Sequence, residues 1–228
     1  MRGRLRQWIQ PLLWKGYRWY LQKKRWYHYD GLAVCVYPTV FHPGLLWTTK
    51  QLLGFVRGLE LSGKRVLELG AGSGLIALWT SRAGALTSAS DINPAALRSM
   101  AESARHNQLS LTLYESDLFD SIPPERFDYI LINPPFYPGE AHDDRERAFF
   151  CGPDFEYFRR LFAQLQSYCS PTAEVYMILT DDCALHTIDE LAAAELIVLR
   201  LCVTHRRWGE RQLIYRLEFL EVEENPVR

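Results

Sequence analysis

The stretch Val66–Gly74, which reads Val-Leu-Glu-Leu-Gly-Ala-Gly-Ser-Gly, decides the fold. An apolar run leads directly into a glycine-rich turn, and apolar residues at helical spacing follow over Gly74–Arg82. Glycines allow tight backbone curvature and a close approach to a ligand, and the start of the helix offers free N–H groups. The stretch therefore predicts a strand, a turn and a helix, with a ligand site where the strand ends.

The same alternation continues on the C-terminal side of this unit and predicts an α/β fold. From about Lys64 onward, short runs rich in Val, Ile and Leu alternate with segments of helical spacing, the pattern of a parallel sheet with helices on both faces. The expected strands are Arg65–Leu69, Leu86–Asp91, Leu111–Glu115, Phe127–Asn133, Ala173–Thr180, Val198–Thr204 and Gln212–Leu220. The expected helices are Gly74–Arg82, Pro94–Asn107, Asp154–Cys169 and Ala184–Ala194.

The last two expected strands form an exception to the parallel arrangement. Only the short segment His205–Arg211, which contains Gly209, joins them. A connection of this length fits an antiparallel hairpin. We therefore expect a mostly parallel sheet of seven strands that ends in an antiparallel hairpin.

The composition limits the class of protein. The chain has 228 residues, of which 48% are hydrophobic and 23% charged, so disorder, collagen and coiled coil are excluded. Its five cysteines form no Cys-x-x-Cys pair and its six histidines show no metal-ligand spacing, so we expect no metal. Because no apolar stretch approaches the roughly 18 residues of a membrane span and no secretory signal is recognisable, we expect a cytoplasmic protein.

Positive charge is concentrated at the N-terminus. Residues 1–29 hold eight of the 26 Lys and Arg residues and none of the 27 acidic ones. Within residues 1–28, apolar and aromatic side chains recur at near-helical spacing among these basic ones, which predicts a helical extension preceding a catalytic domain at 29–228. Basic residues with interleaved tryptophans suit contact with RNA. An anionic membrane surface, or simple packing on the domain, would use the same side chains.

A carboxylate follows the second strand at a distance that indicates a nucleoside site. Asp91 lies about twenty residues after the glycine turn, at the carboxyl edge of the expected sheet, where it can accept hydrogen bonds from ribose hydroxyls. In a dinucleotide fingerprint the third glycine would fall at position 75, which is Leu75, and this disfavours NAD or FAD. No Gly-Lys-Ser/Thr follows the glycines, so a Walker-type phosphate loop is excluded as well.

Two further strand ends carry polar groups. The third strand leads to Asp117 and Leu118, which can bind an adenine amino group and pack against its ring, although Asp117 alone also suits a turn. The fourth strand ends in Asn133-Pro134-Pro135-Phe136. Prolines lack an N–H, so the Asn133 side-chain oxygen and the Pro134 carbonyl are acceptors on a stiff frame beside an aromatic face.

Such a frame suits a substrate with a planar NH₂ group, as on a nucleobase or a glutamine amide. The lone pair of this nitrogen is delocalised, which makes it a weak nucleophile. Hydrogen bonds from both of its N–H groups to Asn133 and Pro134 favour pyramidal geometry and developing positive charge as it attacks a methyl group. The expected catalysis is therefore positioning and electrostatics rather than a charged base.

These residues together resemble the class I S-adenosylmethionine-dependent methyltransferases, which have a Rossmann-like fold. The resemblance is to the branch with an Asn-Pro-Pro-aromatic motif, which includes HemK-like protein glutamine methyltransferases and amino-methylating RNA and DNA enzymes. It covers essentially residues 30–220 and implies S-adenosylmethionine as the methyl donor, S-adenosylhomocysteine as the product and no metal.

The resemblance also implies a role for individual residues. It places Glu68, Gly70, Gly72 and Gly74 at the methionine part of the cofactor, Asp91 and Ile92 at the ribose, Asp117 and Leu118 at the adenine, and Asn133, Pro134, Pro135 and Phe136 at the methyl acceptor. It also implies that Asn133 contacts the cofactor. Three flanking segments, Tyr37–Gly44, Ala148–Asp154 and His205–Arg211, are similar to HemK segments. The Arg-Pro-Glu element of the HemK cap is absent, and Phe136 stands where those enzymes more often have tyrosine.

The acceptor stays open at this point between a nucleobase in rRNA or tRNA and a protein glutamine amide. The basic N-terminal residues favour nucleic acid, and the flanking segments favour protein. The alternatives are a HemK-like glutamine methyltransferase alone, or a non-catalytic protein of the same fold that binds S-adenosylmethionine or RNA. A dehydrogenase is disfavoured by Leu75 and leaves the Asn-Pro-Pro-Phe segment without a purpose.

Overall fold

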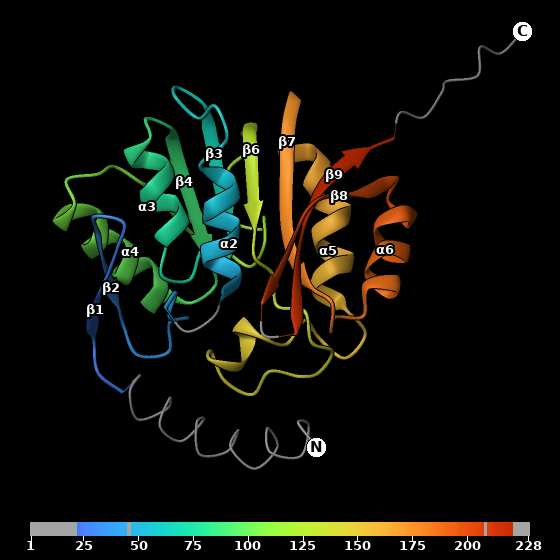
Figure 1. Cartoon of the computed structure of the whole chain (residues 1–228), viewed down its shortest axis with the longest axis horizontal. Coiled ribbons are helices and arrows are strands. Elements are labelled where there is room, and N and C mark those ends of the chain that lie inside the picture. The colour runs from blue at the N-terminus through green and yellow to red at the C-terminus, as the bar shows by residue number, and fades with distance from the viewer. Residues whose placement is uncertain (1–21, 45–46, 208, 221–228) are drawn as a thin grey trace, which may run out of the picture.

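The computed structural model describes residues 22–44, 47–207 and 209–220 and contains two sheets (Figure 1). The larger sheet has the order β5-β4-β3-β6-β7-β9-β8. Its strands are β3 (Arg65–Leu69), β4 (Leu86–Asp91), β5 (Thr112–Glu115), β6 (Phe127–Ile132), β7 (Cys169–Thr180), β8 (Ile197–Arg207) and β9 (Glu210–Phe219). Within this sheet β9 runs antiparallel to both of its neighbours, and the other pairs are parallel. The predicted seven-stranded sheet and its terminal hairpin are thereby confirmed.

Helices cover both faces of this sheet. The helices α2 (Trp47–Val56), α3 (Leu75–Arg82) and α4 (Pro94–His106) contribute their buried side chains to one apolar core. The second core holds those of α5 (Glu156–Leu165) and α6 (Leu185–Ala194), which lie beside β7 and β8 in Figure 1. Neighbouring residues of β6 divide between the two: Leu131 belongs to the first core, and Ile130 and Ile132 belong to the second. This follows from the two-residue period of a strand.

Element boundaries differ from the expected ones mainly at the hairpin and at α5. β7 begins at Cys169 rather than Ala173, and β8 and β9 extend toward each other, so only residues 208 and 209 separate them. The helix expected over Asp154–Cys169 divides into α5 and the short 3₁₀ helix η2 (Gln166–Tyr168). α4 begins as its sequence predicts, because Asn93 accepts a hydrogen bond from the Ala95 N–H at 2.9 Å and Pro94 needs no partner at the first position.

A two-stranded hairpin lies apart from the main sheet and beside α4 (Figure 1). It consists of β1 (Arg25–Tyr29) and β2 (Leu32–Val36), joined by Asp30 and Gly31, both at positive φ. An Asp-Gly pair between strands is a strong hairpin signal, although it is not among the elements predicted above. Residues 25–28 are thus a strand and not the end of a helix. The rest of the predicted N-terminal helix, up to residue 21, lies outside the described residues.

Side chains of α4 hold the outer edge of β2. Cys35 N donates to Ser103 Oγ at 2.8 Å, and Ser99 Oγ donates to the Cys35 carbonyl. One turn further along the helix, the Asn107 amide bonds both the N–H and the C=O of Ala33, at 3.0 and 2.7 Å. A strand edge needs partners when it is buried, and residues at helical spacing provide them here.

Further features bear on the class of protein. All five cysteines are free thiols. In the part of the chain that the structure describes, no helix is long and apolar enough to cross a membrane. The same part of the chain holds no cluster of three His, Cys, Asp or Glu side chains suited to a metal ion.

Candidate active site

A cavity of about 590 Å³ opens at the edge where the parallel strands of the main sheet end. Its volume falls in the range of small-molecule sites, roughly 300–1,000 Å³. Every residue singled out above for the cofactor or the acceptor lines this cavity except Gly74. The segments that the sequence places far apart, at the ends of β3, β4, β5 and β6, therefore meet at one site.

The glycines of the turn after β3 have two different roles. Gly72 adopts φ +54°, and a Cβ there would lie 3.3 Å from Phe41 Cβ, so the missing side chain makes room for the Phe41 segment. Gly74 adopts φ +72° at the start of α3, where a Cβ would lie 2.5 Å from Met100 Cγ on α4. Gly74 therefore permits close packing of α3 against α4, and the structure does not place it on the cavity wall.

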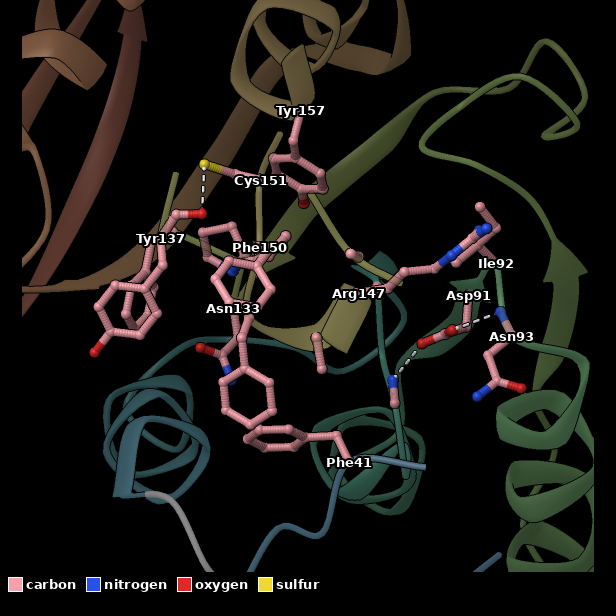
Figure 2. Close-up of a pocket in the computed structure, with 18 of the residues that line it drawn as sticks. Phe41, Asp91, Ile92, Asn93, Asn133, Tyr137, Arg147, Phe150, Cys151 and Tyr157 are labelled. Atoms are coloured by element: carbon pink, nitrogen blue, oxygen red, sulfur yellow. Dashed lines mark hydrogen bonds between the residues drawn. The ribbon is translucent and has the colours of Figure 1, made fainter. Parts of the chain in front are cut away.

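Asp91, at the end of β4, connects the glycine turn after β3 with the start of α4 at the cavity (Figure 2). Its Oδ2 accepts a hydrogen bond from Gly72 N at 2.7 Å and its Oδ1 accepts one from Asn93 N at 2.8 Å. Burial raises the pKa of this carboxyl, and the two backbone hydrogen bonds lower it. Because a carboxylate has more than two lone-pair positions, Asp91 can still accept bonds from a ligand while it holds the turn.

Glu68 is the most deeply buried carboxyl of the site, with a relative exposure of 5%. Its Oε2 accepts a hydrogen bond from Ala77 N in the first turn of α3, at 2.7 Å. Desolvation raises its pKa to about 8, against the opposing effect of the Ala77 hydrogen bond. Near neutral pH this side chain is therefore poised to gain or lose a proton, which its spacing in the sequence does not indicate.

Asp117 and Leu118 follow β5, and Asp117 has a cationic partner. Arg160 of α5 donates to Asp117 Oδ2 at 2.6 Å and also to Asp120 at 2.8 Å. Leu118 adopts φ +54° and is buried. Asp117 and Leu118 thus lie at the cavity as expected. The contact with Arg160 is not predicted by the sequence, because it depends on the placement of α5 beside this loop.

At the opposite end of the cavity, Asn133 has a fixed amide. Its Nδ2 donates to Thr49 Oγ1 of α2 at 3.3 Å. This bond turns the Nδ2 end toward α2 and leaves Oδ1 as the end that can accept from a ligand. Thr49 and its neighbour Thr48 are both buried and line the cavity.

The loop that follows the Asn-Pro-Pro-Phe segment folds back on itself. Tyr137 N donates to the Phe149 carbonyl and Cys151 N donates to the Tyr137 carbonyl, each at 2.9 Å. The phenol of Tyr137 donates to Asp182 Oδ2 at 2.9 Å, and the pKa of Tyr137 is raised, first by desolvation and then by this carboxylate. The ring of Phe136 meets that of Tyr137 edge to face, with centroids 4.8 Å apart. The loop thereby forms a closed wall at the acceptor end.

Aromatic side chains complete the walls between the two ends. Figure 2 shows Phe41, Phe150 and Tyr157 around the cavity, with Asp91 and Ile92 at one end and Asn133 and Tyr137 at the other. The centroids of the Phe41 and Phe149 rings are 6.1 Å apart. Flat apolar walls with polar groups at each end suit a ligand that carries planar rings.

Comparison with known proteins assigns the family. The family model described as "Methyltransferase small domain" matches residues 32–152, more than half of the chain. The chain belongs to this family. Its match begins in β2 and ends at Gly152, so it includes every predicted cofactor and acceptor residue.

Two curated relatives of this methyltransferase small domain chain are similar over part of their length. A protein of Methanocaldococcus jannaschii named "Putative protein N5-glutamine methyltransferase" is 34% identical over 110 residues, which cover 48% of this chain and 53% of the relative. A protein named ribosomal RNA small subunit methyltransferase C of Alcanivorax borkumensis is 32% identical over 145 residues, which cover 62% and 41%. The chain thus spans about half the length of the curated relatives it matches.

A solved structure confirms the Rossmann-like fold. The T. thermophilus 16S rRNA N2 G1207 methyltransferase, solved in complex with S-adenosylmethionine and guanosine, superposes with a TM-score of 0.57 and 18% identity. The alignment covers 85% of this chain and 50% of that one. The likeness concerns the fold, and the predicted class I architecture is confirmed by it.

The cavity also contains residues that sequence reasoning did not find. Thr180 at the end of β7, together with Glu210 and Gln212 at the start of β9, lines its acceptor end. Glu210 falls within the segment His205–Arg211 noted above, whereas no local motif marks Thr180 or Gln212. Because β9 is antiparallel, its first residues reach the same edge at which β6 and β7 end, and only the pairing of β9 with β7 reveals this.

An aromatic and basic surface begins at the cavity and continues over α2 and β1. We call it the β1–α2 surface, and it consists of Tyr27, Tyr29, Trp47, Lys50 and Arg57. Lys50 Nζ lies 4.9 Å from the ring centroid of Trp47, which lines the cavity, and 5.7 and 5.4 Å from those of Tyr27 and Tyr29. Arg57 Cζ lies 5.9 Å from the Tyr29 ring. Cations thus lie over aromatic rings along this surface, and Asp30 pairs with Arg57 at 2.7 Å.

Proposed function

We propose that the protein is an S-adenosylmethionine-dependent N-methyltransferase that acts on a planar amino nitrogen held by Asn133, Pro134, Pro135 and Phe136. The observation that carries this proposal is the Asn133 amide, which Thr49 orients at 3.3 Å in the cavity that also contains Asp91. An oriented acceptor group and a nucleoside-type carboxylate in one cavity are what a methyl donor and an amino acceptor require of a protein.

The chain's own residues fit the cofactor at the β3–β4 end of the cavity. Asp91 would hold the ribose hydroxyls beside Ile92, and Gly70 and Gly72 allow a ligand to approach the turn. Glu68 would face the positively charged methionine part. Asp117 and Leu118 line the place proposed for the adenine. When bound, S-adenosylmethionine supplies a methyl group on a sulfonium sulfur and leaves as S-adenosylhomocysteine.

At the acceptor end, the residues would hold and polarise the nucleophile. Asn133 Oδ1 and the Pro134 carbonyl accept from the two N–H groups of the substrate, which positions its nitrogen lone pair for in-line attack. The same hydrogen bonds strengthen as positive charge develops on the nitrogen. As the N–C bond forms and the S–C bond breaks, the nitrogen releases one proton to water. Phe136 packs against the planar group.

The β1–α2 surface favours RNA as the macromolecule that carries the amino group. Basic side chains neutralise phosphates, and exposed aromatic faces stack on unpaired bases. Trp47 is 38% exposed and links this surface to the cavity. An unpaired nucleotide bound on the β1–α2 surface would place the next base at the cavity mouth. The basic residues within 1–28 support the same partner by charge alone.

A protein glutamine amide is the second candidate, and a specific observation favours it. The relative from M. jannaschii carries the name "Putative protein N5-glutamine methyltransferase" and is 34% identical over the matched part. A glutamine amide presents the same two N–H donors to Asn133 and Pro134 as a nucleobase amino group does.

Calorimetric titration with S-adenosylmethionine, with NAD as the control ligand, tests the cofactor. We expect binding of the methyl donor and none of NAD. A labelled-methyl assay on separate RNA and protein fractions then tests the acceptor, and we expect label in RNA. Label in protein alone would select the second candidate, and absence of S-adenosylmethionine binding would refute the proposal.

A further inference from the structure

Three neighbouring strands bring polar side chains to one row at the acceptor end of the cavity. Asn133 directly follows β6, Thr180 ends β7, and Gln212 lies near the start of β9, paired in register with Thr180. All three residues line the cavity. The row therefore extends the acceptor site beyond the Asn-Pro-Pro-Phe segment.

The three side chains of this row project on the same face of the sheet. Residues two positions away along each strand, Leu131, Ile178 and Ile214, all belong to the core that α2 helps to form. Because alternate residues of a strand point to the same side, the row lies on the α2 face, where Thr49 bonds Asn133. The acceptor and the rest of the row thus share one compartment.

Gln212 differs from the other two members of the row in its hydrogen bonding. Asn133 donates to Thr49, and Thr180 donates to Asp182. Gln212 is 3% exposed, and its Oε1 is buried without a hydrogen-bond partner among the described residues. A buried acceptor without a partner is costly, and an apolar side chain of the same length would avoid the cost. The fold itself therefore gives no reason for an amide at this position.

We propose that Gln212 is a specificity-determining residue. Its side-chain oxygen, buried in the free protein, turns toward the cavity and accepts a hydrogen bond from a ring N–H of the methyl acceptor, next to the amino group held by Asn133. The proposal rests on the proposed function for its acceptor site. A ligand in the cavity then supplies the hydrogen-bond donor that Gln212 Oε1 lacks in the free protein. A ligand without such a donor leaves the oxygen unpaired and binds more weakly, so the site selects for the first ligand.

The chemistry of the amide selects among the possible acceptors. A primary amide presents C=O and N–H side by side, which matches the adjacent N–H and C=O of a lactam edge. Among the nucleobases with an amino group, guanine has such an edge beside it, whereas adenine and cytosine offer a ring acceptor there. A trans peptide group points its N–H and C=O in opposite directions. The ligand class is therefore a guanine-type base.

The spacing of the strands is compatible with a base between the two amides. Neighbouring strands lie about 4.8 Å apart, so β6 and β9, with β7 between them, are separated by about 10 Å. A planar base, held by Asn133 on one side and by Gln212 on the other, spans such a distance together with the two side chains.

The test compares nucleosides that differ only along this edge. Binding of guanosine, inosine and 1-methylguanosine to the free protein is measured by NMR titration, for wild type and for Gln212→Met. Guanosine and inosine keep the ring N–H, and 1-methylguanosine lacks it. We expect wild type to prefer guanosine over 1-methylguanosine by about three- to tenfold, and Gln212→Met to bring this ratio to about one. The thermal stability of the free variant should be unchanged or higher, because the unpaired amide is gone.

Binding of inosine tests the role of Gln212 independently of the proposed methyl transfer. It has the lactam edge but no amino group, so its binding reports the Gln212 contact without Asn133 and without methyl transfer. If S-adenosylmethionine fails to bind while the Gln212-dependent preference for inosine over 1-methylguanosine persists, the methyltransferase proposal is wrong and the base-binding site stands. In a methylation assay on a guanine-containing RNA, Gln212→Met should raise KM and change kcat by less than about twofold.

Gln164 on α5 provides a matched control. Its Oε1 is likewise buried without a partner in the described part of the chain, but Gln164 does not line the cavity. Gln164→Met should keep the wild-type nucleoside ratios. Gln212→Glu, which retains an acceptor oxygen, should keep the preference for guanosine and covers the case in which Gln212→Met does not fold. Three outcomes would overturn the proposal. The guanosine to 1-methylguanosine ratio could stay unchanged in Gln212→Met, or this variant could lose binding of all three nucleosides equally and melt at a lower temperature. The third outcome is that the wild type binds no nucleoside.

Discussion

The two ends of the cavity are built in different ways. At the β3–β4 end, both oxygens of Asp91 and one oxygen of Glu68 accept bonds from backbone N–H groups of the turn and the following helices. At the acceptor end, the Asn133 amide is held at one atom only, and Gln212 Oε1 has no partner among the described residues. One end is therefore a rigid part of the fold, and the other leaves polar atoms for a ligand.

This difference has a chemical consequence. Groups that are already bonded to the backbone are pre-organised and bind a constant ligand at a low entropic cost. Groups without partners gain the most from a ligand that supplies the missing donor, so they discriminate between ligands. In the proposed function, the rigid end serves a common methyl donor and the unpaired end decides which molecule is methylated.

The largest expected effect is at the acceptor end. Asn133→Ala removes the oriented oxygen, so we expect kcat for methyl transfer to fall by about 100-fold or more, while the Kd for S-adenosylmethionine stays within a few-fold. The measurement is a labelled-methyl assay combined with calorimetry. Thr49→Val, which releases the Asn133 amide without removing it, should reduce kcat less. Retained turnover in Asn133→Ala would show that the amide is not catalytic.

The next effect is at the rigid end. Asp91→Ala removes a carboxylate that bonds two backbone N–H groups and, in the proposal, the ribose. Hydrogen bonds to a charged group contribute about 1.5–3 kcal/mol, so we expect the affinity for S-adenosylmethionine to fall by about 10- to 100-fold. Calorimetry measures this, and Asp189→Ala on α6 is the control. An unchanged Kd in Asp91→Ala would be incompatible with ribose binding by this residue.

The same contrast explains what the sequence could predict. The strand, turn and carboxylate at Val66–Gly74 and Asp91 are local patterns, and the structure places them at one cavity. Asn133 is also predictable from its local position, because the last residues of a parallel strand lie at the carboxyl edge of the sheet.

The site residues that the sequence did not predict reach the cavity through contacts between segments that are distant in sequence. Gln212 reaches the cavity through the register of β9 against β7, some thirty residues away in sequence. Arg160 meets Asp117 because α5 packs beside the loop after β5. The resemblance places Gly74 at the cofactor, and the structure adds a packing role, because a Cβ at Gly74 would lie 2.5 Å from Met100 Cγ. Motif spacing does not distinguish a glycine needed for a ligand from one needed for helix packing.

A third prediction uses the protonation of Glu68 at the rigid end. Its pKa is raised to about 8 by burial, so in the folded, ligand-free protein the carboxyl keeps its proton below that pH. A positively charged ligand favours the ionised form. We therefore expect the affinity for S-adenosylmethionine to rise with pH between 6 and 8, by at most about tenfold per unit, and to level off above 8. Glu68→Gln should flatten this profile in calorimetry.

The stability of the free protein should change with pH in the opposite direction. The ordinary pKa of a glutamate is 4.5, and the folded value is about 8. Between these values the folded state binds more protons than the unfolded state, so the free energy of unfolding contributed by Glu68 decreases as pH rises through this window. Thermal unfolding of wild type and Glu68→Gln at pH 6 and 9 measures this, and a wild type that gains stability relative to the variant at pH 9 would contradict the raised pKa.

The smallest expected effect concerns the β1–α2 surface, which would extend the selective end outside the cavity. Lys50 lies among Trp47, Tyr27 and Tyr29, so Lys50→Ala removes one cation from this surface. We expect RNA binding to weaken by a few-fold, and the slope of log K against log salt to become shallower by about one. Fluorescence anisotropy with a single-stranded RNA at several salt concentrations measures both. Lys64→Ala, which lies just before β3 at the opposite edge of the main sheet, should change neither. If the two variants behave alike, the attraction is a property of the overall charge, and the selective end of the site is confined to the cavity.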